Sequence, residues 1–270
     1  MRYIAHITIE TKTPLKVGSN GSDFLQDAPI QRDWNGLPII LGTSIAGVLR
    51  KEFNGDKDEV FGDEDSNKQD AKGSKVIISN ALLIDEKEKV QEKLLLEKSK
   101  FLKLFDNLPI REHTAIDEKG VAKEHSKFDE EVLYKGSRFK FSIELVDSDE
   151  KTFKNILEIL SQNSFRLGGG STKGFGQIEI IEIEYDEIDI QNYDKYSSSL
   201  NSTLSKKYQL SKIDSDNYYS YKLLLKPDDF FMFGSGFGDE DADNTPVYEK
   251  IIDYKNKSLS KEMILIPASS

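Results

Sequence analysis

The sequence contains no cysteine and only three histidines in 270 residues. Without cysteine, a disulfide framework and a thiolate zinc site are excluded, and the composition agrees with a reducing cytoplasm. The histidines at positions 6, 113 and 125 do not have the spacing of zinc ligands. No apolar run approaches the roughly 20 residues that cross a bilayer, and the start MRYIAHITIE does not resemble a signal peptide. We therefore expect a cytoplasmic protein without a membrane partner.

Positive charge is also in short supply. The chain has 37 Lys and Arg against 48 Asp and Glu, which gives a net charge of −11. A protein that coats nucleic-acid duplexes has a basic footprint, so this balance argues against that class. It is still compatible with a local basic groove, because binding depends on where the charges lie.

Strand and helix patterns alternate along the first 188 residues. Their order is strand, helix, strand, long excursion, strand, helix, strand. This order predicts an α+β fold of the ferredoxin-like type (βαββαβ), which is also the core of RNA-recognition motifs and leaves one sheet face free for a ligand. The segments are residues 2–17, a helix that begins at Thr43 or Ser44, KVIISNALLID, SRFKFSIELVD, residues 151–162 and QIEIIEIEY.

Two details refine this prediction. In QIEIIEIEY, the apolar parity slips between Ile180 and Ile181, which predicts a bulge or a strand buried on both faces. Residues 86–105 are charged with scattered leucines, and this composition predicts a helix inside the excursion.

A short internal repeat suggests how the chain is divided. TIETKTPLKVGSNGSDFLQDAPIQRD leads to LPIILGTS, and KLLLKPDDFFMFGSGFGDEDADNTPVYEK leads to ILIPASS. Both copies run from a strand through a Gly-Ser loop and an acidic loop to a short strand. We expect an RNA-recognition-like domain at 1–188 with an insertion at about 85–135, a polar linker at 189–216, and the incomplete start of a second similar module at 217–270.

The stretch FRLGGGSTKGFGQIEI places an unusual number of glycines directly before a strand. Glycines without a Cβ let backbone N–H groups approach a ligand, and successive N–H groups form an anion-binding concavity. The alternative is a tight helix-to-strand connection that needs positive φ. The motif lacks the spacing of a nucleotide-binding P-loop. The candidate phosphate contacts are Arg166, Gly168, Gly169, Gly170, Lys173 and Phe175, the last of which could instead support the turn.

A second candidate site lies at the start of the first helix. Thr43 and Ser44 are placed to cap that helix, and a helix N-terminus also attracts phosphate. Arg50 and Lys51 follow one or two turns later and could reach a backbone phosphate or simply form a solvated face.

Three segments together resemble one family. PIQRDWNGLPIILGTSIAGVLR, FRLGGGSTKGFGQIEI and AIDEKGVAKEHSKFDEEVLYKGSRFKFSIEL are similar, in this order, to the repeat-associated mysterious protein (RAMP) superfamily of CRISPR systems, and the last segment to the backbone subunits of type III effector complexes. The resemblance covers most of residues 2–185. It implies an antiviral-defence subunit that binds guide RNA (crRNA) and target RNA beside other CRISPR effector subunits.

The resemblance also implies an enzymatic role. In type III backbones an aspartate before the Pro-hydrophobic strand cleaves target RNA with a divalent metal, and the matching residue is Asp27 in QDAPI. Asp27 would hold Mg²⁺ or act as a base. By residue pattern alone, an aspartate before Ala-Pro is an ordinary turn-forming residue. Asp23 and Asp33 are nearby acids, and Ala46 stands where the family helix often has a lysine.

Two alternatives to this metal-dependent endoribonuclease stay open. The chain could be a structural RNA-binding subunit that does not cleave. It could also be a guide-processing endoribonuclease, a class that commonly uses histidine acid–base chemistry.

Overall fold

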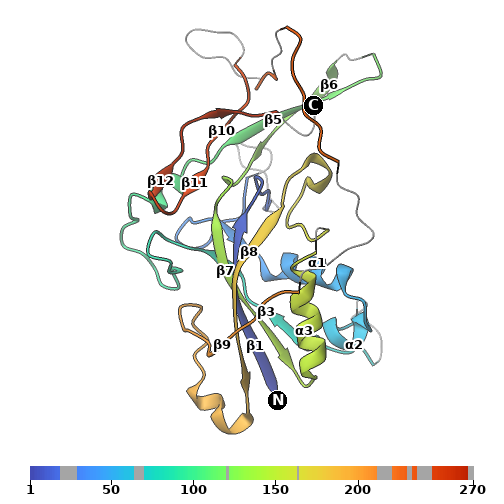
Figure 1. The fold of residues 1–270 in the computed structure, drawn as a ribbon, viewed down its shortest axis with the longest axis vertical. Helices are drawn as coiled ribbons and strands as arrows, with labels where there is room; N and C mark the ends of the chain where they lie inside the picture. Colours follow the sequence, from blue (N-terminus) through green and yellow to red (C-terminus); the bar gives the residue numbers. More distant parts are fainter. Residues whose placement is uncertain are drawn as a thin grey trace.

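The computed structural model describes residues 1–18, 29–63, 70–119, 122–162, 164–211, 221–229, 233–235 and 245–266. For residues 113–116, 122–127, 190, 194 and 195 it describes the backbone only. The described part is elongated, with the main sheet in the centre of Figure 1 and a hairpin and the C-terminal strands at its upper end. It is a mixed α+β structure in which all named strand pairs are antiparallel.

The main sheet is built around β1 (Arg2–Thr11), which lies between β7 (Arg138–Val146) and β8 (Ile178–Ile188). The strand order is β2-β4-β7-β1-β8-β9, with β3 also paired to β7. The pairing of β1 with β8 shifts register next to Thr8, where Ile181 has no partner, so the predicted bulge is confirmed. The smaller strands are β2 (Ile39–Ile40), β3 (Val76–Ile78), β4 (Ala81–Leu83) and β9 (Lys206–Lys207).

Helices cover one face of this sheet. They are α1 (Gly42–Glu52), α2 (Lys57–Phe61) and α3 (Glu150–Ile159). Odd-numbered residues of β1 point toward them, as shown by the ring of Tyr3, which stacks on Phe153 of α3 with 5.5 Å between centroids. Asp149 begins α3 as its N-cap by accepting a hydrogen bond from the Thr152 N–H at 2.8 Å. The core thus forms between the odd face of β1 and the apolar stripes of the helices.

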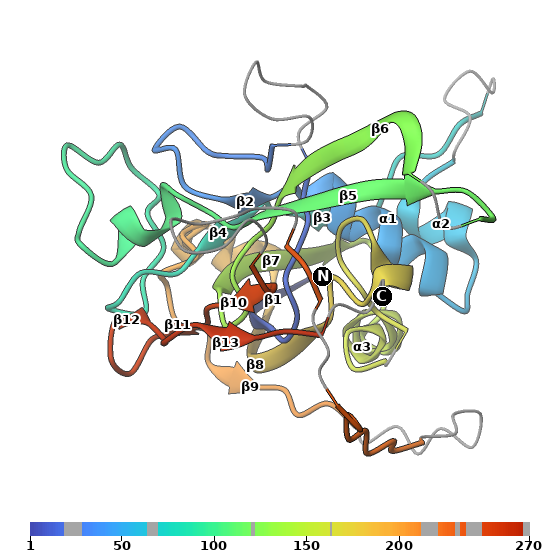
Figure 2. The ribbon, with the colours of Figure 1, turned by 90° about the horizontal axis from the view of Figure 1, so that it is seen from above.

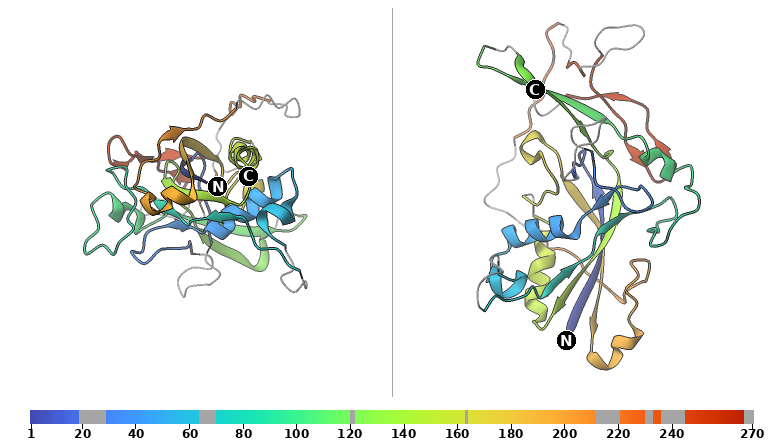
Figure 3. Two further views of the ribbon diagram at one scale, coloured as in Figure 1. Left: turned by 90° about the horizontal axis from the view of Figure 1, so that it is seen from below. Right: turned by 180° about the vertical axis from the view of Figure 1, so that it is seen from behind.

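The other face of the sheet is partly covered by residues 190–207 (Figure 3, right panel). This segment starts with η3 (Ile190–Lys195), and its Leu204 is buried with Ile4 of β1 and Ile188 of β8. Leu200 is buried in a second cluster beside β4. The free face expected for a ligand is therefore occupied, because two leucines of the predicted linker find apolar partners there.

His6 lies beneath this cover. Its side chain is buried, its Nδ1 lies 3.2 Å from the Ser202 carbonyl oxygen, and its Nε2 has no partner among the described residues. Burial, reinforced by the positive charge of Lys140, lowers the pKa of His6 below its ordinary value of 6.5. The neutral imidazole is therefore the form that the fold favours.

The excursion between β4 and β7 is not helical as predicted. In place of a helix at 86–105 the structure has turns and one short 3-10 helix, η1 (Leu102–Phe105). The leucines at 94, 95 and 96 are consecutive and so cannot share one helical face. A two-stranded hairpin follows, β5 (Ile110–Ile116) with β6 (Ala122–Glu131), and it extends from the body in Figure 2.

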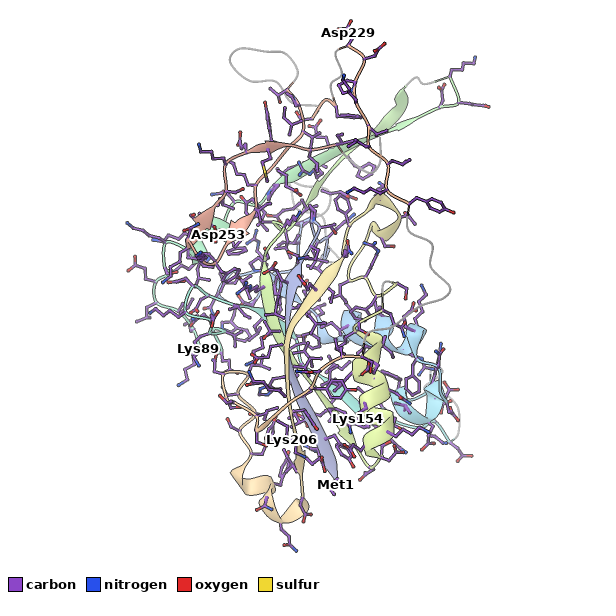
Figure 4. The ribbon with its side chains drawn as sticks, in the orientation of Figure 1. Met1, Lys89, Lys154, Lys206, Asp229 and Asp253 are labelled. Atoms are coloured by element: carbon purple, nitrogen blue, oxygen red, sulfur yellow. The ribbon has the colours of Figure 1, made fainter. Side chains whose placement is uncertain are left out.

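The C-terminal region forms two small strand pairs, β10 (Tyr248–Glu249) with β13 (Met263–Ile264) and β11 (Ile252–Asp253) with β12 (Ser258–Leu259). They pack against the first unit: the Ile252 N–H donates to the Lys135 carbonyl oxygen at 2.9 Å, and the Tyr254 hydroxyl donates to that of Ile84 at 2.9 Å. Figure 4 places Asp229 and Met1 at opposite ends of the molecule. The division into two modules stays a prediction.

Within the described ranges, every helix is too short or too polar to span a membrane.

Candidate nucleic-acid interface

The glycine loop (residues 167–176) connects α3 to β8 and is fixed to the segment that follows β1. The Gly169 N–H donates to the Lys16 carbonyl oxygen at 2.9 Å, and the Gly176 N–H donates to that of Pro14 at 3.0 Å. The loop therefore rests on the main chain of residues 14–16.

This docking explains two of the glycines. Gly168 has φ +74°, and a Cβ on it would lie 2.0 Å from the Lys16 carbonyl oxygen. Gly176 has φ +79°, and a Cβ there would lie 2.0 Å from the Leu167 carbonyl oxygen. At Gly169 the nearest atom to a Cβ would be 3.6 Å away, so that position has room. The tight-connection interpretation is thus correct for part of the motif.

The amides that could meet a ligand are fewer than the sequence suggests. Gly169 uses its N–H inside the protein, whereas no described group accepts from the N–H of Gly168 or Gly170. Gly168 is exposed and Gly170 is half-buried. Two unpaired N–H groups separated by one residue can still donate to an anion.

A cleft of about 330 Å³ opens beside this loop. Three segments form it: the end of the β1 extension, the first turns of α1 and the glycine loop. The sequence-predicted residues Ser44, Gly168 and Gly169, which come from two separate motifs, therefore lie in one cleft. The lining residues are Lys16, Val17, Gly18, Gln31, Leu41, Ser44, Val48, Gly168 and Gly169.

Helix α1 presents its N-terminus to the cleft, but not in the predicted way. Leu41 is the N-cap residue and its side chain makes no capping hydrogen bond, so the prediction that Thr43 or Ser44 caps the helix is wrong. The Asn80 side chain instead accepts from the Gly42 N–H at 2.9 Å. Thr43 and Ser44 lie in the first turn with exposed side chains. Their exposure at a helix N-terminus suits contact with an anion.

Arg50 and Lys51 do not line the cleft. The Arg50 guanidinium donates to the carbonyl oxygens of Lys57 at 3.0 Å and Gly62 at 2.5 Å and pairs with Asp58 at 2.5 Å. These contacts hold α1 to α2, so Arg50 has a structural role. The Lys51 side chain is exposed, and its RNA contact stays a prediction.

The three side chains predicted to flank the loop have different surroundings. Arg166 lies at the base of the loop in a bridge with Gln177, and its Nη1 is buried without a partner among the described residues. Lys173 has its Nζ 5.6 Å from the ring centre of Phe128, a residue of β6. The Phe175 ring packs against Gly170, so it supports the turn. Lys173 thus connects the loop to the hairpin through a cation–π contact.

Asp27 and Asp23 lie outside the described residues. The ends of their segment are described: Gly18, which lines the cleft, bridges to Ile30. The buried Glu131 carboxylate accepts from the Ile30 N–H at 3.0 Å and pairs with Arg32 at 2.7 Å. The segment that contains Asp27 therefore begins at the rim of the cleft.

The described residues do not build a metal centre. No group of three potential metal ligands occurs among them, and the cleft lining contains no carboxylate. Asp33 uses its Oδ1 to accept from the N–H groups of Asn35 at 2.8 Å and Leu37 at 2.9 Å, so it stabilises a turn. The side chains of His113 and His125 are not described, and His6 is buried under the sheet cover and does not line the cleft.

Sequence reasoning missed Lys16 and Gln31. Lys16 sits in the cleft with its Nζ paired to the buried Glu130 of β6. A single lysine after a strand has no distinctive local pattern. Only the docking of the glycine loop on its carbonyl group brings it into the site.

Comparisons with known proteins give two similar solved structures and one matching family model. A chain in the cryo-EM structure of Type III-B Cmr-beta in the apo state is 18% identical with a TM-score of 0.47, over 66% of this chain and 96% of that one. A chain of Type III-B Cmr-beta bound to cognate target RNA is 20% identical with the same TM-score, over 69% and 61%. No curated protein matches. The model of the RAMP superfamily matches residues 8–179, more than half of the sequence, and this chain belongs to that superfamily.

Proposed function

We propose that this chain is a guide-RNA-binding subunit of a type III CRISPR ribonucleoprotein. The observation that carries the proposal is the convergence of two independent motifs, the glycine loop and the start of α1, on one cleft in a member of the RAMP superfamily. We further infer that the strand order β4-β7-β1-β8, with a helix in each crossing, corresponds to a ferredoxin-like core.

The cleft suits a backbone phosphate. The N–H group of Gly168 and the exposed first turn of α1 supply donors at the cleft, and the unpaired N–H of Gly170 follows two residues later in the loop. Lys16, which also pairs with Glu130, brings an ammonium group to the cleft lining. Lys16 thereby provides the cation that Ala46 cannot. Such contacts fix the register of an RNA strand without reading its bases, which is what a subunit that accepts any guide needs.

Target-RNA cleavage is the finer proposal, and it rests on Asp27. The described residues alone do not fit a Mg²⁺ site, so Asp27 would have to provide the carboxylate. When bound, the metal would favour in-line attack of a 2′-hydroxyl or water on the adjacent phosphate. The position of Gly18 at the cleft rim supports this proposal, because the Asp27 segment follows Gly18 directly.

RNA binding tests the first proposal. Lys16→Ala should weaken the binding of unrelated RNA sequences by a similar factor and reduce the salt slope of log K by about 0.7 to 0.9, as expected for one lost phosphate contact. Lys173→Ala should act in the same direction. Lys207→Ala is the matched control, because Lys207 is exposed on β9 and pairs with Glu182.

Fluorescence anisotropy over a range of salt concentrations gives both the affinity and the slope. Equal slopes for Lys16→Ala, Lys173→Ala and the control would refute binding at this cleft. Thermal unfolding of each variant separates a binding loss from unfolding, since Lys16 also pairs with Glu130.

Cleavage is tested with Asp27→Ala and Asp27→Asn in the assembled complex. Loss of Mg²⁺-dependent target cutting with unchanged RNA affinity would support catalysis by Asp27. If the native complex binds target and never cuts it, the structural-subunit alternative holds. Cutting of repeat RNA without metal would instead identify a guide-processing enzyme.

A further inference from the structure

Three large apolar side chains lie exposed on the excursion side of the molecule. Trp34 is the only tryptophan and is 59% exposed, Leu94 is 71% exposed and Leu96 is 101% exposed. We call these residues the Trp34 patch. Single exposed apolar residues are ordinary, whereas a cluster that includes a tryptophan is characteristic of interaction surfaces.

The two segments that carry the patch are held together. The Asn35 amide donates to the Lys93 carbonyl oxygen at 3.0 Å and accepts from the Leu95 N–H at 2.8 Å, so it is bonded on both sides of Leu94. The Asp33 carboxylate closes the turn that contains Trp34. Leu95 packs into the core. The turn and the excursion lie side by side in Figures 2 and 3, and the patch is therefore presented by a fixed backbone.

Acidic and basic side chains near the patch differ in whether they have partners within the protein. Three of the five acidic side chains of residues 85–100 accept hydrogen bonds within the protein: Asp85 from the Lys89 N–H at 2.9 Å, Glu86 from the Ser99 hydroxyl at 2.9 Å, and Glu92 from the Leu200 N–H at 2.7 Å. The other two are exposed and form ion pairs, Glu88 with Arg138 at 3.9 Å and Glu97 with Lys103 at 3.5 Å. Of the five lysines in this range, Lys98 pairs with Asp106. The other four have no hydrogen bond or ion pair among the described residues. They are Lys87, Lys89, Lys93 and Lys100, and Lys89 lies at the outer edge in Figure 4.

The result is an apolar centre with a cationic rim on a chain whose net charge is −11. We propose that the Trp34 patch docks a second protein that offers an apolar pocket rimmed by Asp and Glu. Bound RNA would neutralise the lysines but leave the aliphatic Leu94 and Leu96 in water, whereas a protein pocket covers both. Trp34 would be the central anchor, and the lysines would steer and orient the partner.

The test uses the assembly isolated from cells through a tag on this chain. A carbodiimide joins lysines only to carboxylates, so it should link Lys93 or Lys100 to Asp or Glu of another polypeptide. Oxidative footprinting should show Trp34 at least fivefold less reactive in the assembly than in the isolated chain. Both results should survive treatment with ribonuclease.

Two variants sharpen the test. Trp34→Ser combined with Leu96→Ser, and separately Lys93→Glu with Lys100→Glu, should each lower recovery of the cross-linked polypeptide at least tenfold while leaving RNA binding at the cleft unchanged. Ile77→Ser is the control, because Ile77 is 48% exposed on β3, away from the patch. Unchanged RNA binding separates this proposal from the one on the cleft.

Four outcomes would overturn the proposal. They are an equally reactive Trp34 in the assembly and the free chain, protection that disappears with ribonuclease, cross-links only between copies of this chain in a mixture of ¹⁴N- and ¹⁵N-labelled protein, and recovery that neither folded double variant reduces. The second outcome would indicate a nucleic-acid surface and the third a contact between copies.

Discussion

The two ends of the chain have similar sequence patterns, but they bury them to very different extents. In β1, Ile4, Ala5 and Ile7 are 0% exposed. In the corresponding C-terminal segment, Leu223 is 82% exposed and Leu224 is 94% exposed. An apolar strand-like pattern therefore indicates a tendency to form a buried strand. Whether the strand forms depends on neighbouring strands and helices that can pack against it.

The partners explain the difference. β1 has β7 and β8 along its two edges and a helix layer on one face. Residues 221–229 have no strand partner among the described residues. Residues 245–266 are intermediate, because Ile252 is buried in the core cluster of the first unit while Ile264 stays 67% exposed. The comparison predicts that stability is concentrated in the N-terminal unit.

The test with the largest expected effect removes one apolar side chain from each region. Phe139→Ala deletes a fully buried ring of β7 and should lower the free energy of unfolding by about 3–5 kcal/mol. Leu224→Ala removes an exposed side chain and should change it by no more than about 0.5 kcal/mol. Urea unfolding followed by circular dichroism measures both. Comparable losses would show that the C-terminal segment is packed in solution.

The next test concerns the close backbone contact between Gly168 and Lys16 in the N-terminal unit. Gly168→Ala should lower the free energy of unfolding by at least about 1–2 kcal/mol, because a positive φ and the Lys16 carbonyl oxygen both oppose a Cβ. Gly169→Ala is the control, and its effect should stay below about 1 kcal/mol. Equal effects at the two positions would contradict the docking of the loop on residue 16.

A smaller effect is expected where the two regions touch. Tyr254→Phe removes a hydroxyl that donates to the Ile84 carbonyl oxygen and accepts from the Arg138 N–H at 3.1 Å. The loss should be about 1.5 kcal/mol. Tyr248→Phe, at a 40% exposed residue, is the control. The exchange rate of the Arg138 amide should rise in Tyr254→Phe. An unchanged rate would mean that this contact does not couple the stability of the two regions.

The smallest effect concerns the cover over the sheet. Because the pKa of His6 is lowered in the fold, the unfolded chain binds a proton first as pH falls below 6.5. The contribution to stability is therefore complete above this pH and decreases as the pH falls below it. His6→Gln cannot titrate and should show a flatter pH profile in thermal unfolding. Identical pH profiles of the native chain and His6→Gln would mean that the pKa of His6 is not lowered and that residues 190–207 do not bury its side chain in solution.

The sequence predicted the regular part of the fold well, because alternating residues such as Phe139 and Phe141 have one obvious burial pattern. The prediction failed in the excursion, where the charged residues and leucines at 86–105 have a composition typical of a helix. The structure has turns there, and the side chains of Asp85 and Glu86 accept hydrogen bonds that stabilise them. The prediction also missed the packing of Leu200 and Leu204, since isolated leucines in a polar stretch do not reveal their partners.

The candidate site was predictable in its parts and not in its assembly. The glycine loop and the start of α1 are visible as motifs, and the structure brings Ser44 and Gly169 to one cleft. Lys16 could not be predicted, because its place depends on main-chain docking between segments about 150 residues apart. The role of Arg50 was equally hidden, since its acceptors are carbonyl oxygens that become available only when α2 folds back on α1.

Two neighbouring carboxylates at the end of β6 hold the residues on both sides of the segment that contains Asp27. Glu131 is the last residue of β6, and its single carboxylate holds both Ile30 and Arg32, just after the segment that contains Asp27. The neighbouring Glu130 forms an ion pair with Lys16, which lies just before that segment. Because the two neighbouring carboxylates are carried by one strand end, a shift of the end of β6 would move Lys16, Ile30 and Arg32 together.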